Sequence, residues 1–220
     1  MSSPPSPPPS STSGVALLSL FLLDTVSVAM LVPFLPQFYG MLPFSDIARE
    51  NMSSLYSFSQ ILGGYVFGLA SDTAGVGRRK ALLLASFAAS AASYYAVAKA
   101  EEVRGERGLW IVVASRLLVG FFKQSLTMTT SLMTSGSGDK TAEVGRISAC
   151  LTLGWIVGPT LGSLLASRAG LEYVPRASAA IMAFNAVAAA AVLSDEGEKG
   201  GGGGKPKGRK TKEPDAWSPL

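Results

Sequence analysis

Long uncharged stretches alternate with short charged clusters along this chain. Six stretches are apolar on nearly every side when drawn as helices, whereas a helix of a water-soluble bundle carries a polar stripe. They cover residues 14–45, 51–71, 81–98, 109–138, 147–167 and 177–194. Each is long enough to cross a hydrocarbon layer about 30 Å thick, and in lipid only a helix satisfies all its backbone groups within one segment. The pattern predicts an all-α polytopic membrane protein with six transmembrane helices within residues 14–194.

The two flanking segments have a different composition. Residues 1–13 contain five prolines and six serines without a charge, which predicts a disordered tail. A secretory signal peptide has a basic region ahead of its apolar stretch. Residues 1–13 have none, so we expect the first apolar segment to stay in the membrane as an anchor. Residues 195–220 are rich in Gly and Lys and include a run of five glycines. They are expected to form a solvated cytoplasmic tail or the start of a central loop.

Lys and Arg in the connections predict the orientation, because they favour the cytoplasmic side. With the N-terminus inside, eleven basic residues fall on the cytoplasmic side and six on the other. The difference depends on residues 195–220, without which the counts are five and six, and on the compact cluster at residues 78–80. We therefore expect a multi-pass protein of a plasma or organelle membrane with both termini in the cytoplasm.

The composition also excludes several kinds of chemistry. Charged residues make up only 15% of the 220 residues, against about 25% in an ordinary globular domain. The absence of His excludes Ser-His-Asp and Cys-His catalysis and His-ligated zinc. The single cysteine, Cys150, is expected to be a small packing residue. We expect no enzyme, no cofactor and no metal. The net charge of +4 comes from basic residues at the edges of apolar segments, which favours a lipid bilayer over nucleic acid as the surroundings.

Asp24 is the only charge in the first apolar segment. An ionisable residue at membrane depth costs about 2.5–3.5 kcal/mol or more, so it is a functional hypothesis by default. Asp24 and Ser27 share one helix face and should look toward a protein interior or a wet cavity. Low-dielectric surroundings favour the neutral form of a carboxyl group, so Asp24 could carry a proton. A purely structural, hydrogen-bonding role is the alternative.

Two cations lie in the fourth segment. Arg116, Gly120 and Lys123 share one face at spacings of four and three. Two cations on one stripe need water, a counter-ion or an anionic ligand, and Asp24 is the only carboxylate at comparable depth. We therefore expect an electrostatic relation between Asp24 and Arg116, direct or through water. For Lys123, snorkelling to an interface is an equal alternative. We count Lys123 and its neighbour Gln124, together with Asp24 and Arg116, as candidate residues of a solute or proton pathway.

Small and polar residues form stripes on two further segments. Ser53, Ser57, Gln60, Gly64 and Gly68 share one face of the second segment. Such a stripe either lines a pore or packs closely against another helix, and packing is the better interpretation of the glycines.

In the fifth segment, Gly154, Gly158 and Gly162 recur every four residues. This spacing lets another helix approach closely. Pro159 lies within the same stretch, where it removes a backbone donor and bends the helix.

These motifs together resemble the N-terminal half of a major facilitator superfamily transporter, close to the drug and tetracycline:proton antiporter branch. The connection at residues 68–80 is similar to the family's G-x-x-x-D-[RK]-x-G-R-R signature. Its matching residues are Gly68, Asp72, Gly75, Arg78 and Arg79, the last two after a shift of two. Arg116 with Gly120 resembles the R-x-x-x-G element. The fifth segment resembles the G-x-x-x-G-P-x-x-G signature, and Asp24 ahead of residues 32–36 is similar to the family's first helix.

The resemblance implies a proton-coupled secondary transporter of a small organic solute that works by alternating access. The Asp72 loop would gate the cytoplasmic side, Arg116 would couple to protonation, and Asp24 would line the solute or proton path together with Gln60. The glycine signature would pack between two six-helix halves, of which only one is present here. Its partner would be a missing C-terminal half or a second copy. The alternative is a non-transporting six-helix membrane interaction or regulatory protein, or an inactive fragment.

Overall fold

The computed structural model describes residues 11–42, 45–72, 76–103, 105–134 and 138–200. All regular elements in these ranges are helical. In chain order they are α1 (Ser11–Leu31), η1 (Val32–Phe34), α2 (Leu35–Gly40), α3 (Asp46–Asp72), α4 (Val76–Val103), α5 (Gly105–Phe122), α6 (Ser125–Thr134), α7 (Lys140–Arg168) and α8 (Tyr173–Gly200).

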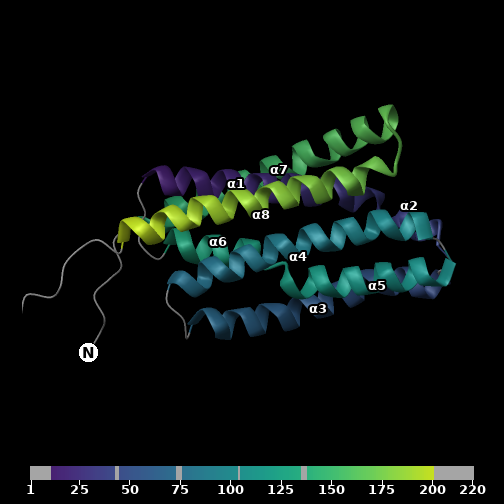
Figure 1. Ribbon diagram of the computed structural model, residues 1–220, viewed down its shortest axis with the longest axis horizontal. Coiled ribbons are helices and arrows are strands. Elements are labelled where there is room, and N and C mark those ends of the chain that lie inside the picture. Colours follow the sequence, from purple (N-terminus) through teal and green to yellow (C-terminus); the bar gives the residue numbers. More distant parts are fainter. Residues whose placement is uncertain (1–10, 43–44, 73–75, 104, 135–137, 201–220) are drawn as a thin grey trace, which may run out of the picture.

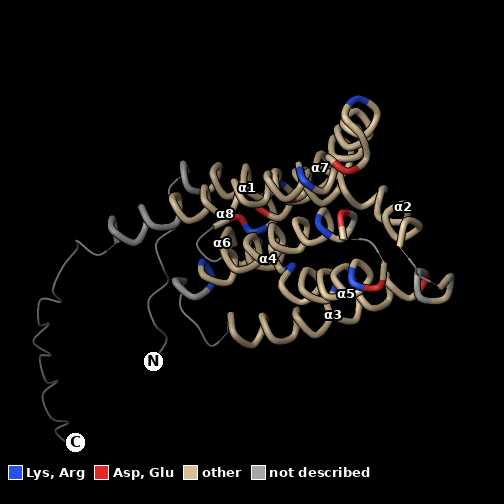
Figure 2. The backbone as a smooth tube through the Cα atoms, turned by 45° about the vertical axis from the view of Figure 1, so that its right-hand side comes forward, with Lys and Arg blue, Asp and Glu red and all other residues tan. Residues whose placement is uncertain are grey.

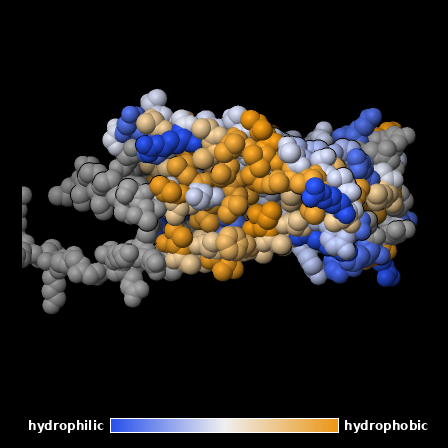
Figure 3. Space-filling model, turned by 90° about the horizontal axis from the view of Figure 1, so that it is seen from above, coloured by the Kyte–Doolittle hydropathy of each residue, from blue (hydrophilic) through white to orange (hydrophobic). Residues whose placement is uncertain are grey.

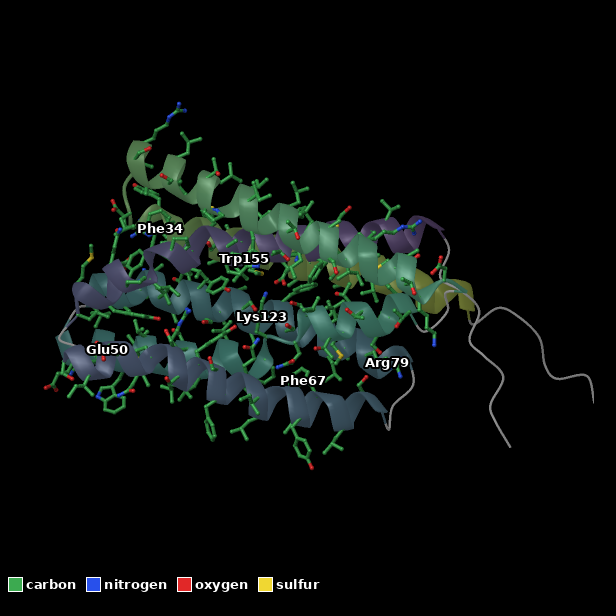
Figure 4. The ribbon with its side chains drawn as sticks, turned by 180° about the vertical axis from the view of Figure 1, so that it is seen from behind. Phe34, Glu50, Phe67, Arg79, Lys123 and Trp155 are labelled. Carbon is green, nitrogen blue, oxygen red and sulfur yellow. The ribbon has the colours of Figure 1, made fainter. Side chains whose placement is uncertain are left out.

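These helices run up and down a single elongated bundle (Figure 1). α1 begins and α8 ends at one end of the bundle, and α2 together with the α7–α8 connection lies at the other. We call these the terminal end and the distal end. Arg79 lies toward the terminal end and Glu50 toward the distal end (Figure 4).

Five stretches of helix are long and apolar enough to cross a membrane, namely Gly14–Gly40, Arg79–Ala100, Gly105–Thr134, Lys140–Arg168 and Tyr173–Val192. Figure 3 shows that apolar residues cover the middle of one face of the bundle, with more hydrophilic residues toward both ends of that face. Charged residues gather mainly at the ends (Figure 2). The second predicted segment, residues 51–71, lies in α3, which has 27 residues. Polar residues between Asp46 and Gln60 lower the mean hydropathy of α3, so it is not in that group.

Several predicted boundaries move. α1 begins at Ser11, inside the predicted tail, because Ser and Thr are favourable at a helix start and the last early proline is Pro9. α8 continues to Gly200, six residues into the predicted C-terminal tail, and includes good helix formers such as Glu196 and Lys199. Residues 1–10 and 201–220 lie outside the described residues.

The fourth predicted helix is wrong as a single element. Residues 109–138 were expected to be continuous, but α5 ends at Phe122 and α6 begins at Ser125. At this break the Gln124 amide donates to the Phe122 carbonyl at 2.7 Å, and the Lys123 amide donates to the Val119 carbonyl at 2.8 Å. The helix break therefore places two polar residues, Lys123 and Gln124, between two helix ends.

The glycine stripe of α7 packs against α1 of the same chain. A Cβ at Gly158 would lie 2.6 Å from the Ala29 Cβ, and one at Gly154 would lie 2.5 Å from the Thr25 Cγ2. Gly162 fits against the Met30 carbonyl in the same way. The expectation that this stripe packs between two halves and lacks its partner here is wrong, because α1 supplies the surface. Beyond this contact, the distal end of α7 leans away from the bundle (Figure 1).

A second close contact joins α3 to α5. A Cβ at Gly63 would lie against the Phe121 carbonyl, and one at Gly120 would lie 2.8 Å from the Tyr56 carbonyl. The Ser59 hydroxyl donates to the Leu117 carbonyl at 2.8 Å. The glycine that lets α3 approach is therefore Gly63, outside the predicted stripe.

Buried polar side chains join α1 to α8. The hydroxyls of Ser27 and Ser178 each donate to the other residue's carbonyl, at 2.9 and 3.1 Å. The Asn185 amide donates to the Leu20 carbonyl at 2.8 Å. Ser27 thus looks into the protein as expected, but it contacts α8 and takes no part in the surroundings of Asp24.

Candidate solute and proton pathway

Asp24 forms a buried ion pair with Lys123. The Lys123 ammonium donates to Asp24 Oδ1, and the Ser125 hydroxyl donates to Oδ2 at 2.6 Å. The side chains of Asp24 and Lys123 are 2% and 10% exposed. The snorkelling alternative for Lys123 is therefore wrong, since its side chain lies within the bundle near the level of Trp155 (Figure 4). Ser125 was not anticipated, although it follows Lys123 by only two residues.

The helix break favours both charges of this pair. Lys123 directly follows the last residue of α5, where the helix dipole stabilises a cation, and the Asp24 carboxylate accepts from the first residue of α6, where the dipole stabilises an anion. Because charges inside a bundle lose much of their hydration, these two helix ends offset part of that loss. The arrangement can hold an ionised carboxylate and would respond to its protonation.

Aromatic side chains cover the helix break on the α3 side. The rings of Phe67, Phe121 and Phe122 contact one another edge to face, with centroids 5.3–6.0 Å apart. Phe67 is 4% exposed. This cluster belongs to an apolar core that also includes Phe21, Phe87 and Met128. The side of the break that faces α3 is therefore apolar.

Arg116 does not pair with Asp24. Its side chain is 5% exposed, and its Nε and Nη2 atoms have no hydrogen-bond partner. Its guanidinium carbon lies 6.0 Å from the centroid of the Tyr94 ring of α4. The direct form of the expected Asp24–Arg116 relation is therefore wrong, because Asp24 pairs with Lys123; a relation through water stays a prediction. Arg116 and Lys123 share a face of the predicted continuous helix. Because the helix is interrupted after Phe122, only Lys123 reaches Asp24.

Arg116 lines a cleft of about 420 Å³. Gln60, from α3, lies in the same wall, while Asp24, Lys123 and Gln124 are outside the lining. The side-chain amide of Gln124 donates to the backbone carbonyl of Gln60 at 3.2 Å, which connects the cleft wall to the helix break. The further lining residues come from α1, η1, α2, α3, α4, α5 and α7 and are Val28, Leu31, Val32, Leu35, Tyr39, Met52, Ser53, Tyr56, Ser57, Tyr94, Val119 and Trp155.

Most of the predicted gating segment belongs to helices and not to a loop. Gly68 and Asp72 belong to α3, Arg78 and Arg79 to the first turn of α4, and Gly75 lies outside the described residues. A Cβ at Gly68 would meet nothing within 4 Å. The Nε of Arg79 is buried without a hydrogen-bond partner. Side chains at Asp72 and Arg78 are outside the described set, so the charge network expected of this segment stays a prediction.

Among the described residues, no group of acidic, Cys or His side chains is suited to hold a metal ion. The arrangement brings two kinds of buried charge into the same region of the bundle. One carboxylate is held between a cation and a hydroxyl, and a second cation, Arg116, faces a cleft.

Comparisons with known proteins relate the chain to a family of transporters. The model of the Major Facilitator Superfamily matches residues 17–220. A tetracycline resistance protein, class G, of Vibrio anguillarum is 28% identical over 89% of this chain and 48% of its own length. Human solute carrier family 67 member A1 is 31% identical over 83% of this chain and 42% of its own length. A Lactococcus lactis homologue of the multi-drug resistance efflux pump PmrA is 27% identical over 67% of this chain. The chain spans about half the length of the curated relatives it matches.

Proposed function

Because this chain belongs to the Major Facilitator Superfamily, we propose that it forms one six-helix half of a proton-coupled secondary transporter of a small organic solute. The observation that carries the proposal is the buried pair of Asp24 and Lys123 at the helix break. The names of relatives, a tetracycline resistance protein and a multi-drug efflux pump homologue, support an exporter of organic compounds. The chain is a multi-pass membrane protein, and no catalytic step is proposed for it.

Proton coupling follows from the charges at the break. When Asp24 takes up a proton, its attraction to the Lys123 ammonium disappears, while the ammonium remains buried. An unpaired buried charge is unfavourable, so the protonated form favours a different arrangement of α5 and α6. Gln124 and Gln60 transmit that change to the cleft, because their hydrogen bond joins the break to the cleft wall. The solute site and the proton site are thereby coupled.

Alternating access needs a second half, because such transporters hold the solute between two repeats. We propose that this half is either a further segment or a second copy of the chain. We propose that both termini lie in the cytoplasm, as the distribution of Lys and Arg in the connections predicts. α1 begins and α8 ends at the same end of the bundle (Figure 1), and Arg79, Lys80 and Lys140 lie toward that end by chain connectivity.

The test is proton movement in vesicles that contain the transport-competent assembly. With a pH-sensitive dye inside, addition of a solute panel that includes tetracycline should release or take up protons. Asp24→Asn should abolish this signal, because the side chain can no longer exchange a proton. Glu102→Gln is the matched control, since Glu102 is also a paired carboxylate but is exposed. Solute-driven proton movement of wild-type size in the Asp24→Asn variant would refute the coupling role.

A non-transporting membrane interaction protein is the second candidate. The observation that favours it is that α1 of the same chain covers the glycine stripe of α7, so that this stripe needs no second half as its partner. The size of the native assembly in mild detergent discriminates between the two. A stable monomer of 220 residues favours this candidate, whereas an assembly with a second half or copy favours transport.

A further inference from the structure

Arg116 lacks an anionic partner among the described residues. Two of its guanidinium nitrogens, Nε and Nη2, are buried and make no hydrogen bond. Asp24, the carboxylate expected to neutralise it, is occupied by Lys123 and Ser125. Tyr94 offers a ring face but no negative charge. Since a buried guanidinium without a counter-ion is unfavourable, an anion brought to Arg116 from outside would be stabilised.

The cleft beside Arg116 has the size and composition of a small-molecule site. Its volume of about 420 Å³ falls within the range of about 300–1,000 Å³ that is typical of ligand pockets. Aromatic side chains line it from four elements, namely Tyr39, Tyr56, Tyr94 and Trp155. Ser53, Ser57 and Gln60 add hydrogen-bonding groups on the α3 side. The cleft therefore offers flat apolar surfaces together with a few polar contacts.

The charge of the cleft selects the ligand. Arg116 is the only charged side chain among its fourteen lining residues, so the lining carries a formal charge of +1 and no carboxylate. A planar guanidinium binds a carboxylate through two parallel hydrogen bonds. A monoanion would neutralise the cleft, whereas a dianionic phosphate would leave one charge unpaired. A cationic solute would meet Arg116 without any compensating group in the lining.

We propose that this cleft binds a monoanionic aromatic solute, with its carboxylate on Arg116 and its ring among Tyr56, Tyr94 and Trp155. The inference rests on the proposed function in that the bound solute is the transported one. It adds the substrate class and gives Arg116 the role of solute anchor, in place of the coupling role that the family resemblance implies.

Three probes with the same ring test the proposal. They are 2-naphthoate, its neutral amide 2-naphthamide, and the cation 2-naphthylmethylammonium. Binding to the complete assembly in detergent is measured by titration calorimetry at constant pH and chloride concentration. We expect the carboxylate to bind at least tenfold more tightly than the amide, and the amide more tightly than the cation. Equal or tighter binding of the amide or the cation would overturn the proposal. A carboxylate of the other half already paired with Arg116 would produce the same result.

Substitutions then assign the preference to Arg116. Arg116→Gln should remove the difference between carboxylate and amide without weakening amide binding, whereas Arg116→Lys should keep part of it. A preserved tenfold preference in Arg116→Gln contradicts the proposal. Should Arg116→Gln not fold, the three-probe series on the wild-type protein still decides the matter.

The result is separable from the test of transport. Charge-selective binding without proton movement would support this inference and refute the proposed function. Proton movement together with charge-blind binding would do the reverse.

Discussion

Asp24 and Lys123 are 99 positions apart in the sequence, yet they form a buried ion pair across the point where α5 gives way to α6. The pair joins α1 to the helix break, and the Ser125 hydroxyl donates a second hydrogen bond to the Asp24 carboxylate. Two helix ends that meet at one place therefore hold one charge each. This relationship is the basis of the first prediction.

Removing one member of the pair should destabilise the protein more than removing both. Lys123→Gln leaves the Asp24 carboxylate buried without its cation, and breaking a buried pair in this way costs about 3–5 kcal/mol. Adding Asp24→Asn removes the orphaned charge, so the double variant should regain part of that loss. Unfolding is followed on heating in detergent through the reactivity of the single thiol, at Cys150, with a fluorogenic maleimide.

The comparison of the single and double variants supplies its own control. Losses that simply add would show that the two side chains do not interact. A double variant less stable than Lys123→Gln would contradict the ion pair outright.

The contact between α1 and α7 predicts that Gly158→Ala is harmful. The added methyl would lie 2.6 Å from the Ala29 Cβ and 2.8 Å from the Val26 carbonyl, so the two helices must move apart. Overpacking of this kind typically costs about 1–3 kcal/mol. Gly145→Ala in the same helix is the matched control, because its Cβ meets nothing within 4 Å and Ala is the better helix former. The same thermal assay should show a loss for the first variant and none for the second.

A parallel pair of substitutions separates the two glycines of α3. Gly63→Ala pushes a methyl group into the Phe121 carbonyl at the end of α5, whereas Gly68→Ala enters open space. We expect Gly63→Ala to lower the unfolding temperature and Gly68→Ala to leave it unchanged or raise it. Since Gly68 belongs to the predicted gating segment, proton movement in vesicles should be measured for both variants. A loss of stability in Gly68→Ala would show that a further surface covers this position.

Glu102 gives a pH dependence whose direction is fixed. The hydrogen bond from Lys99 lowers the pKa of Glu102 below its usual value of 4.5, and the nearby Arg176 acts in the same direction. A lowered pKa in the folded protein means that the contribution is present above pH 4.5 and is lost as pH falls through the lower folded value. The difference in unfolding temperature between wild type and Glu102→Gln should therefore be small at pH 7 and disappear in acid. A difference that grows toward low pH would contradict this ion pair.

Much of the fold could be predicted from the spacing of charges. Uninterrupted apolar stretches predicted the helices, because a backbone in lipid has only its own groups to bond with. Asp24 and Arg116 were expected inside the protein, and both are at most 5% exposed. α3 shows the limit of this reasoning, since its polar residues serve the cleft and the contact with α5, and its hydropathy does not reveal how it packs.

The partners of the key residues could not be predicted. No Pro or Gly marks the break at Lys123, so periodicity treated residues 109–138 as one helix and placed both cations on one face. Asp24 pairs with Lys123 and not with Arg116 because of how the helices pack, and this packing also brings the Ser125 hydroxyl to the Asp24 carboxylate. A glycine stripe shows that some helix approaches closely, but only the structure identifies that helix as α1.

The cleft and the phenylalanine cluster make the two ends of the bundle different. Part of the cleft lining comes from η1, α2 and the first half of α3, which lie toward the distal end, whereas Phe67, Phe121 and Phe122 belong to a core whose other members lie toward the terminal end. A solute bound at Arg116, as proposed above, would therefore lie on the distal side of this phenylalanine cluster. If the proposed transport function holds, a transport cycle would have to separate these phenylalanine rings before a solute could pass to the terminal end.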